Sequence, residues 1–311
     1  EMSRWKVHGF IPIWVVNRDM RAFGRYNANY GCPQLRRKVA CLHSLVAGPA
    51  AESRNRDPEA VAVVIGSSRG IGLAITQELI RRFQGKIFAC CRNPGNAGAL
   101  NALWKFVPER FETLQLDVTQ ECTIVAAAEH VSNASNNRVD LLINTAGILH
   151  RKEEGHMPER NISELNAEWA MENFRVNTLG PAQVAKHFSP LMVTSRKPGR
   201  VFSVFASISA RVSSISDNRL GGWYSYRMTK CGLNQMVKTL SLQVGRRGMV
   251  CVTLHPGTVD TDLSQPFQQR VNPEKLFPVD KAAFQLLDVI DRLESEDTGK
   301  LFAYDGSEIP F

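Results

Sequence analysis

The chain contains 311 residues, 43% of them hydrophobic and 22% charged, which are ordinary values for a globular protein of one large domain or two small ones. Its formal net charge of +8 is concentrated in residues 1–56, where ten Lys/Arg and three Asp/Glu give +7, so the rest of the chain lacks the basic surface of a nucleic-acid-binding protein. No apolar run approaches the roughly 18 residues that cross a bilayer, and we expect no membrane partner.

The seven cysteines are scattered, and they form neither a CxxC pair nor a cluster with histidine at metal-ligand spacing. Most stand among apolar residues, as small buried side chains do. We therefore expect no metal site, and we expect an intracellular, reducing compartment in which the thiols stay unpaired.

Residues 1–57 differ from the rest of the sequence, because they are rich in arginine, poor in acidic residues and without sustained periodicity. The polar run at 53–58 is the expected boundary with a domain at 58–311. A basic leader of this kind is typical of a transit peptide for a plastid or mitochondrion, and without one we expect the cytoplasm. Its many aromatic residues and few serines are unusual for such a peptide. The alternatives are a disordered tail and upstream sequence that is not normally translated.

From residue 60 onward, short apolar runs alternate with helical patterns. The expected strands are 61–65, 86–91, 111–116, 139–143, 200–205, 250–254 and 300–303. The expected helices are 70–83, 96–106, 119–132, 167–187 with an extension to 192, 223–245 and 279–293. Strands that are apolar throughout and separated by helices predict an α/β fold, a single doubly wound Rossmann-type domain with a parallel sheet of about seven strands and helices on both faces. Ligands of such sheets bind outside the carboxyl ends of the strands.

The first strand ends in a glycine-rich turn, Gly66-x3-Gly70-x-Gly72, which leads directly into a helix. The turn gathers backbone N–H groups and the positive end of the helix dipole at one point, which suits a diphosphate. Gly66 permits the turn, and Gly70 and Gly72 let a dinucleotide and the helix approach the backbone. The spacing differs from the common GxGxxG order, so the alternative is a glycine-rich turn of another α/β protein.

Two arginines stand where the ribose of a bound dinucleotide is recognised. Arg92 follows the second strand, at a position where an acidic residue would bind an unphosphorylated ribose, and Arg69 lies inside the glycine turn. Guanidinium groups attract a 2′-phosphate, so the pair favours NADP(H) over NAD(H). The alternative is that both are solvated surface arginines.

Polar residues also follow the third and fourth strands. Asp117 can accept a hydrogen bond from an adenine amino group, or it can cap the next helix. Asn144 can tie the end of its strand to the neighbouring strands, and the small residues after it let the backbone approach a ligand.

Tyr226 and Lys230 are spaced i, i+4 at the start of a predicted helix, so their side chains share one face. An adjacent ammonium favours the phenolate and lowers the tyrosine pKa from its usual value near ~10, which makes the pair a candidate acid/base unit. The alternative is a surface tyrosine beside a solvated lysine.

The motifs follow one another in the order Gly66-x3-Gly70-x-Gly72, Asp117-Val118, Asn144-Thr145-Ala146-Gly147, Asn177, Tyr226-x3-Lys230 and Pro256-Gly257. This series resembles the classical short-chain dehydrogenases/reductases over about residues 60–311. The run Gly221-Gly222-Trp223 before the tyrosine is similar to the carbonyl-reductase-like branch of that family.

The resemblance implies a role for each catalytic candidate. Tyr226 protonates the carbonyl oxygen, or deprotonates the alcohol in reverse. Lys230 lowers the tyrosine pKa and holds the nicotinamide ribose, and Asn177 orders a water that links the lysine to solvent. For Asn177 the alternative is a polar contact inside a helix. The implied cofactor site consists of Gly66, Ser68, Arg69, Gly70, Ile71, Gly72, Arg92, Asp117, Val118, Asn144, Ala146, Gly147, Tyr226, Lys230, Pro256, Gly257, Val259 and Thr261.

The sequence departs from the family pattern in two places. Thr145 stands where the family usually has a second asparagine. The serine pair after the fifth strand is not clearly present, and we assign the catalytic serine to Ser209, with Ser213 and Ser207 as alternatives and with the further alternative that none of them is catalytic.

The resemblance therefore predicts an NADP(H)-dependent oxidoreductase that acts on a carbonyl or an alcohol. The alternative is a catalytically weak nucleotide-binding regulatory or scaffold protein on the same fold. A Rossmann-like methyltransferase is disfavoured, because it has no need for Tyr226, Lys230 and Asn177 together. We expect segments 149–165, 207–222 and 262–277 to select the small-molecule substrate. Relatives form homodimers or homotetramers, and some in this branch are monomers.

Overall fold

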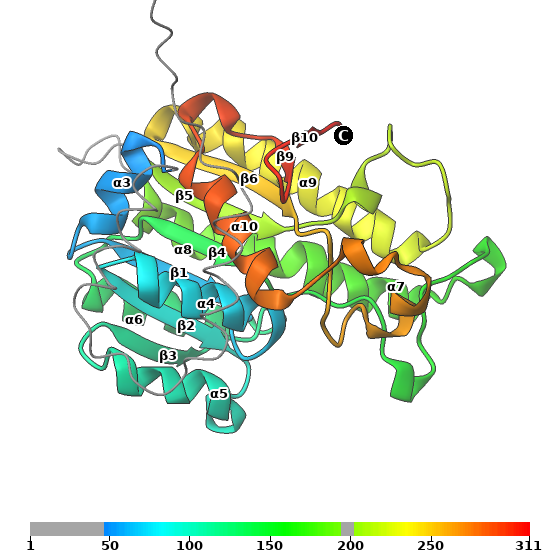
Figure 1. Ribbon diagram of the computed structural model, residues 1–311, viewed down its shortest axis with the longest axis horizontal. Helices are drawn as coiled ribbons and strands as arrows, with labels where there is room; N and C mark the ends of the chain where they lie inside the picture. Colours follow the sequence, from blue (N-terminus) through cyan, green and yellow to red (C-terminus); the bar gives the residue numbers. More distant parts are fainter. Residues whose placement is uncertain (1–46, 194–201) are drawn as a thin grey trace, which may run out of the picture. The chain divides into compact units, whose positions relative to one another are not determined.

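An eight-stranded sheet forms the centre of the fold, in the order β10-β9-β6-β5-β4-β1-β2-β3 (Figure 1). The computed structural model describes residues 47–193 and 202–311. The strands of this sheet are β1 (Val61–Ile65), β2 (Lys86–Cys91), β3 (Phe111–Gln115), β4 (Leu141–Asn144), β5 (Ser203–Ile208), β6 (Met249–His255), β9 (Leu301–Ala303) and β10 (Glu308–Ile309). The seven expected strands are all present and parallel, which confirms the doubly wound fold. The fifth lies at 203–208 rather than at the expected 200–205, of which residues 200 and 201 are outside the described ranges. The short antiparallel strand β10 is an addition that the sequence pattern did not predict.

Helices cover both faces of the sheet. They are α3 (Pro49–Arg56), α4 (Gly70–Arg82), α5 (Gly98–Asn101), α6 (Glu121–Ala134), α7 (Ala167–Phe174), α8 (Gly180–Met192), α9 (Tyr224–Val244) and α10 (Val279–Asp291). Successive strand residues point to opposite faces. Val64 and Ile143 accordingly pack with α4 and α10, which lie side by side in Figure 1, whereas Val63 and Leu142 pack with α6, α8 and α9.

The chain order creates a switch point between β1 and β4. Strands β2 and β3 lie on one side of β1, and the chain then crosses to β4 on the other side. Loops leave the two central strands in opposite directions there, and this is where a crevice opens in sheets of this kind. The candidate residues after β1, β4, β5 and β6 all lie at this carboxyl edge.

Two predicted helices differ from the structure. The stretch expected as one helix at 96–106 is split into α5 and two 3-10 turns, Pro94–Asn96 and Ala102–Phe106. Glycines at 95 and 98 weaken helix formation there. The long helix at 167–192 is interrupted by a π-helical turn, η5 (Arg175–Leu179). Pro181 has no N–H to bond the carbonyl of Asn177, so the α-helical ladder cannot continue at this point.

The folded unit begins before residue 58, where the leader was expected to end. Arg54 of α3 is 7% exposed, and its guanidinium lies 2.6 Å from the Asp291 carboxylate. The Gly48 N–H donates to the Asp291 carbonyl at 2.8 Å. Removing one partner of a buried ion pair typically costs about 3–5 kcal/mol, so residues 48–56 belong to the folded domain. The rest of the expected leader, including the transit-peptide interpretation, lies outside the described residues.

The described thiols are unpaired. Cys90, Cys91 and Cys251 are buried, Cys231 is half-buried and Cys122 is exposed. Burial raises the pKa of Cys251 to about 12, so this thiol is unreactive at neutral pH.

Two absences hold for residues 47–193 and 202–311. No helix in these ranges is long and apolar enough to cross a membrane. The same ranges contain no group of three His, Cys, Asp or Glu residues arranged to hold a metal ion.

Candidate active site

The glycine turn between β1 and α4 leaves no room for side chains. Gly66 has a φ of +83°, a left-handed conformation that glycine adopts without strain. A Cβ on Gly72 would lie 2.2 Å from the Gly66 carbonyl oxygen, so the helix packs on the turn only because residue 72 is glycine. No side chain caps the N-terminus of α4. The first N–H groups of α4 therefore have no capping side chain as acceptor. Such groups at the start of a helix can donate to a diphosphate.

The two predicted phosphate-binding arginines are both exposed. Arg92 directly follows β2 and has no ion-pair partner among the described residues. Arg69 pairs with Asp262 at 2.9 Å, with both side chains more than 70% exposed. This pair connects the glycine turn to the loop after β6, and the exposure of both arginines agrees equally well with cofactor binding and with solvated surface residues.

Asp117 makes a local turn before α6. One of its carboxylate oxygens accepts hydrogen bonds from the Thr119 N–H at 2.9 Å and from the Thr119 hydroxyl at 2.7 Å. Helix α6 itself begins four residues later, at Glu121. Asp117 therefore resembles a residue that caps the chain before a helix more than one whose carboxylate is free to accept from adenine. The next residue, Val118, packs against Gly180, where a Cβ would lie 2.7 Å from the valine side chain.

Asn144 at the end of β4 is 1% exposed, and its amide oxygen and nitrogen have no hydrogen-bond partner in the described residues. The expectation that this side chain ties the strand to its neighbours is wrong. Thr145 makes that connection instead, because its hydroxyl donates to the Ile65 carbonyl at 2.7 Å. A buried amide without a partner requires a ligand or a water, and this one lies beside the glycine turn.

Tyr226 and Lys230 lie on α9, 8% and 3% exposed. The Lys230 Nζ lies 5.8 Å from the centroid of the Tyr226 ring and donates to the Ile208 carbonyl at 2.8 Å. Because both side chains are buried, the pair is not a surface tyrosine beside a solvated lysine.

The pKa values of this pair shift through burial. Burial raises the pKa of the Tyr226 phenol, and burial lowers the pKa of Lys230 to about 8. The shift of the Tyr226 phenol is opposite in direction to the one expected from an adjacent ammonium, because burial disfavours the charged phenolate. The phenol keeps its proton at neutral pH.

Asn177 stands in the π-helical turn η5 and connects three elements. Its side chain accepts from the Ile148 N–H at 2.8 Å, and it donates to the Ile148 carbonyl at 2.9 Å and to the Thr229 hydroxyl at 3.2 Å. A Cβ on Gly147 would lie 3.2 Å from Asn177 Oδ1 and 3.4 Å from Lys230 Nζ. The glycine therefore allows the loop after β4 to approach both side chains.

The three candidate serines differ in their surroundings. Ser209 and Ser213 are buried, and their hydroxyls share one partner, Asn234, at 2.8 and 2.7 Å. Ser207 is also buried, lies in register with Asn144 on β4 and has no partner in the described residues. Asn234 is a residue of this site that was not among the sequence-based candidates. Its position four residues after Lys230, on the Tyr226 face of α9, was the signal that could have identified it.

The predicted cofactor residues after β6 fold back toward the glycine turn. Gly257 has a φ of +78°, and the segment continues into β7 (Thr258–Val259), which pairs with β8 (Leu276–Phe277). A Cβ on Gly70 would lie 3.5 Å from the Thr261 methyl group. Pro256, Gly257, Val259 and Thr261 thus belong to a loop that meets the glycine turn. The remaining candidates, half-buried, are Ser68 and Ile71 beyond Gly66 and Ala146 after β4.

Two of the three segments expected to select the substrate, 149–165 and 262–277, meet near Trp223, which directly follows the third segment. The Trp223 ring lies 6.2 Å from the Tyr226 ring and 5.0 Å from the Phe267 ring, and the His150 ring lies 6.0 Å from Phe267. The His150 Nε2 also lies 3.3 Å from the Asp262 carbonyl oxygen. The three aromatic side chains therefore form a connected group, and Trp223 at the start of α9 is the member that lies against the Tyr226 ring.

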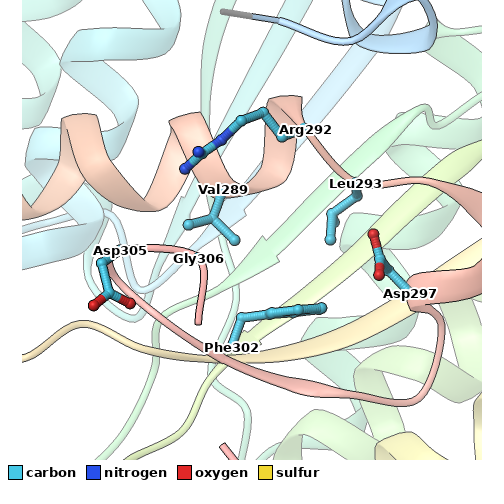
Figure 2. Close-up of a pocket in the computed structure, with 7 residues that line it drawn as sticks. All are labelled: Val289, Arg292, Leu293, Asp297, Phe302, Asp305 and Gly306. Carbon is cyan, nitrogen blue, oxygen red and sulfur yellow. The ribbon is translucent and has the colours of Figure 1, made fainter. Parts of the chain in front are cut away.

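A cavity of about 160 Å³ lies elsewhere, between the end of α10 and the β9–β10 hairpin (Figure 2). Apolar Val289, Leu293 and Phe302 line it together with charged Arg292 and Asp305. It contains none of the predicted site residues, so it is separate from the candidate active site.

Comparison with known proteins gives one family. A family model described as short chain dehydrogenase matches residues 60–272. An uncharacterised oxidoreductase of Schizosaccharomyces pombe is 29% identical over 261 residues, which cover 81% of this chain and 98% of that protein.

Two solved structures are similar in fold. The carbonyl reductase Sniffer of D. melanogaster is 25% identical with a TM-score of 0.71, and the match covers 82% of this chain and 100% of that chain. The NADPH-bound carbonyl reductase from chicken fatty liver is 27% identical with a TM-score of 0.72, and the match covers 85% of this chain and 98% of that chain.

Proposed function

Because the chain belongs to the short-chain dehydrogenase family, we propose that it is an NADP(H)-dependent oxidoreductase that transfers a hydride between the nicotinamide and a carbonyl or alcohol substrate. The observation that carries the proposal is the buried pair Tyr226 and Lys230, one helical turn apart on α9 beside the switch point of the sheet. Buried groups with shifted pKa values cluster at functional sites, and both members of this pair are such groups.

Tyr226 is the general acid of the proposed reduction. When bound, the cofactor supplies or accepts the hydride. Tyr226 donates its phenolic proton to the carbonyl oxygen and takes it back from the alcohol in the reverse direction. The raised pKa of the phenol keeps the donor protonated at neutral pH, which suits carbonyl reduction.

Lys230, Asn177 and Ser209 support the tyrosine in this proposal. The Lys230 ammonium holds the nicotinamide ribose, and with a pKa lowered to about 8 it still carries its charge at pH 7. Asn177 orders a water near the lysine. Ser209 holds the substrate oxygen, for which its hydroxyl must rotate away from its present partners, Asn234 and Ser213.

The preference for NADP(H) rests on the basic residues near the ribose position. Arg92 is exposed and unpaired among the described residues, and Arg69 stands in the glycine turn. The chicken carbonyl reductase, solved with NADPH bound, supports the same choice for this chain.

A substrate screen tests the proposed function. Purified protein with NADPH is offered aldehydes, ketones and quinones, and oxidation of NADPH is followed by absorbance. The proposal predicts turnover of at least one carbonyl class and much slower turnover with NADH. NADPH binding without oxidation by any compound would favour a nucleotide-binding regulatory or scaffold protein instead.

A further inference from the structure

Glu159 is a buried carboxylate in the segment between β4 and α7. It is 3% exposed, whereas the residues that follow it at 160–168 are exposed. Its side chain accepts one hydrogen bond from the Ser225 N–H at 3.2 Å and another from the Ser225 hydroxyl. Its main-chain carbonyl accepts a third from the Trp223 N–H. Burying a carboxylate costs free energy unless hydrogen bonds compensate for the lost water. The bonds to Ser225 therefore hold the Glu159 side chain in this position.

The contact caps the helix that carries Tyr226. Helix α9 begins at Tyr224, and its N-cap residue, Trp223, makes no side-chain capping bond. Ser225 is the second residue of the helix, and its N–H is one of the groups that a capping side chain normally satisfies. Glu159 satisfies it from a segment 66 residues earlier, with a negative charge that suits the helix N-terminus. The general acid is the next residue in the chain.

The backbone before α9 adopts a conformation that needs such support. Gly221, Gly222 and Trp223 have φ values of +64°, +66° and +55°. Two glycines adopt this conformation freely, but it is unfavourable for a tryptophan. Strained residues of this kind persist where the surroundings fix them, and they gather at functional sites.

Two groups hold the run in place. The Arg227 guanidinium donates to the carbonyls of Gly221 and Gly222 at 3.0 and 2.9 Å. The Glu159 carbonyl accepts from Trp223. As a result the indole is fixed edge-on to Tyr226, at 6.2 Å between ring centroids.

We propose that Glu159 is a positioning residue, which acts through Ser225 and Trp223 to fix the orientation of Tyr226 and of the indole beside it. The proposal rests on the proposed function of Tyr226. Glu159 joins the segment between β4 and α7, which we expect to contact the substrate, to the first turn of α9. An error of about 1 Å in the position of a catalytic group can cost about 100-fold in rate, so loosening this contact lowers kcat.

The test compares Glu159→Gln with Glu168→Gln in the full chain. Glu168 is an exposed glutamate in the first turn of α7, and its variant controls for loss of a carboxylate. Glutamine keeps its carbonyl oxygen for the Ser225 N–H, but its NH2 group must donate to the Ser225 hydroxyl, so the charge and the two charge-assisted hydrogen bonds are lost. We expect kcat to fall at least about tenfold for Glu159→Gln, with the Kd of NADPH within twofold of wild type, and no change for Glu168→Gln.

A second set of variants tests the route through Ser225. Ser225→Ala lowers kcat as Glu159→Gln does, and Ser225→Thr, which keeps the hydroxyl, restores most of it. The double variant Glu159→Gln/Ser225→Ala is no slower than the slower single variant, because the two residues act as one unit. Unchanged kcat in Glu159→Gln, or a loss of NADPH binding as large as the loss of kcat, overturns the positioning role.

Amide hydrogen exchange separates this proposal from the proposed function. Exchange in the peptide 221–228 becomes faster in Glu159→Gln and stays as in wild type in Glu168→Gln. Unchanged exchange overturns the proposal even if the protein is an active reductase. If none of the tested carbonyl compounds causes the wild type to oxidise NADPH, the proposed function fails. The exchange result then still decides whether Glu159 holds the start of α9.

Discussion

The ammonium of Lys230 donates a hydrogen bond to the carbonyl oxygen of Ile208 at 2.8 Å. This bond attaches the second turn of α9 to the last residue of β5, so the charge is held at the carboxyl edge of the sheet. Burial lowers the pKa of Lys230 to about 8, which means that the folded protein binds its proton less tightly than the unfolded chain does.

The first prediction concerns Lys230→Met, which keeps the bulk of the side chain and removes its charge. The lysine pKa is about 8 when folded and near 10.4 when unfolded. The unfolded chain therefore binds more protons between these values, and wild-type stability rises with pH across this window. The free energy of unfolding of Lys230→Met minus that of wild type should fall by up to about 3 kcal/mol from pH 7 to pH 10. Denaturant unfolding at both pH values measures it, and a difference that grows with pH would contradict the lowered pKa.

The second prediction concerns the pH dependence of turnover. Because burial raises the pKa of Tyr226, the phenol stays protonated through neutral pH, and carbonyl reduction should show no loss of rate there from this group. Alcohol oxidation needs the deprotonated phenol, so its rate should rise with pH. Rate profiles in both directions test this, and a reduction rate that falls steeply between pH 6 and 7 would be inconsistent with it.

The third prediction concerns Arg92→Ala. Loss of a guanidinium that binds a 2′-phosphate should raise the KM for NADPH about tenfold or more and leave the KM for NADH nearly unchanged. Arg247→Ala is the matched control, since Arg247 is exposed in the 3-10 turn Gly245–Arg247 that follows α9. Equal effects of Arg92→Ala on both cofactors would show that the residue does not read the phosphate.

The fourth prediction concerns Gly72→Ala. A Cβ would lie 2.2 Å from the Gly66 carbonyl, so the turn must shift, and we expect a loss of about 2 kcal/mol or more in stability together with weaker NADPH binding. Gly98→Ala is the control, because its Cβ would meet nothing within 4 Å. Thermal unfolding measures the stability of both variants, and titration measures their affinity for NADPH. Wild-type stability and affinity in Gly72→Ala would show that the helix does not need a glycine at residue 72 to pack on the turn.

Much of the fold follows from patterns that are local in the sequence. The apolar runs predict the strands, because a parallel sheet is buried on both faces. The turn at Gly66 and the pair Tyr226 and Lys230 are also local patterns. Their position at one edge of the sheet follows from the alternation of strands and helices.

The features that the sequence did not reveal depend on contacts between distant segments. Helix α3 is short and polar, and it is held by the ion pair of Arg54 with Asp291 rather than by an apolar stripe. Glu159 looks like any charged loop residue until the fold brings it to Ser225. The raised pKa of Tyr226 depends on burial, which i, i+4 spacing does not report.

If the Tyr226 phenol is the acid of a hydride-transfer reaction, its removal should slow single-turnover oxidation of NADPH by a carbonyl substrate, and this rate is measured for Tyr226→Phe and for Tyr224→Phe. Tyr224 lies one residue before Ser225 and has methionine, not lysine, four residues on, so it controls for loss of a hydroxyl in the same turn. We predict that Tyr226→Phe binds NADPH as wild type does and loses at least about 100-fold in the rate of oxidation, while Tyr224→Phe keeps most of it. Oxidation by Tyr226→Phe at the wild-type rate would contradict the account.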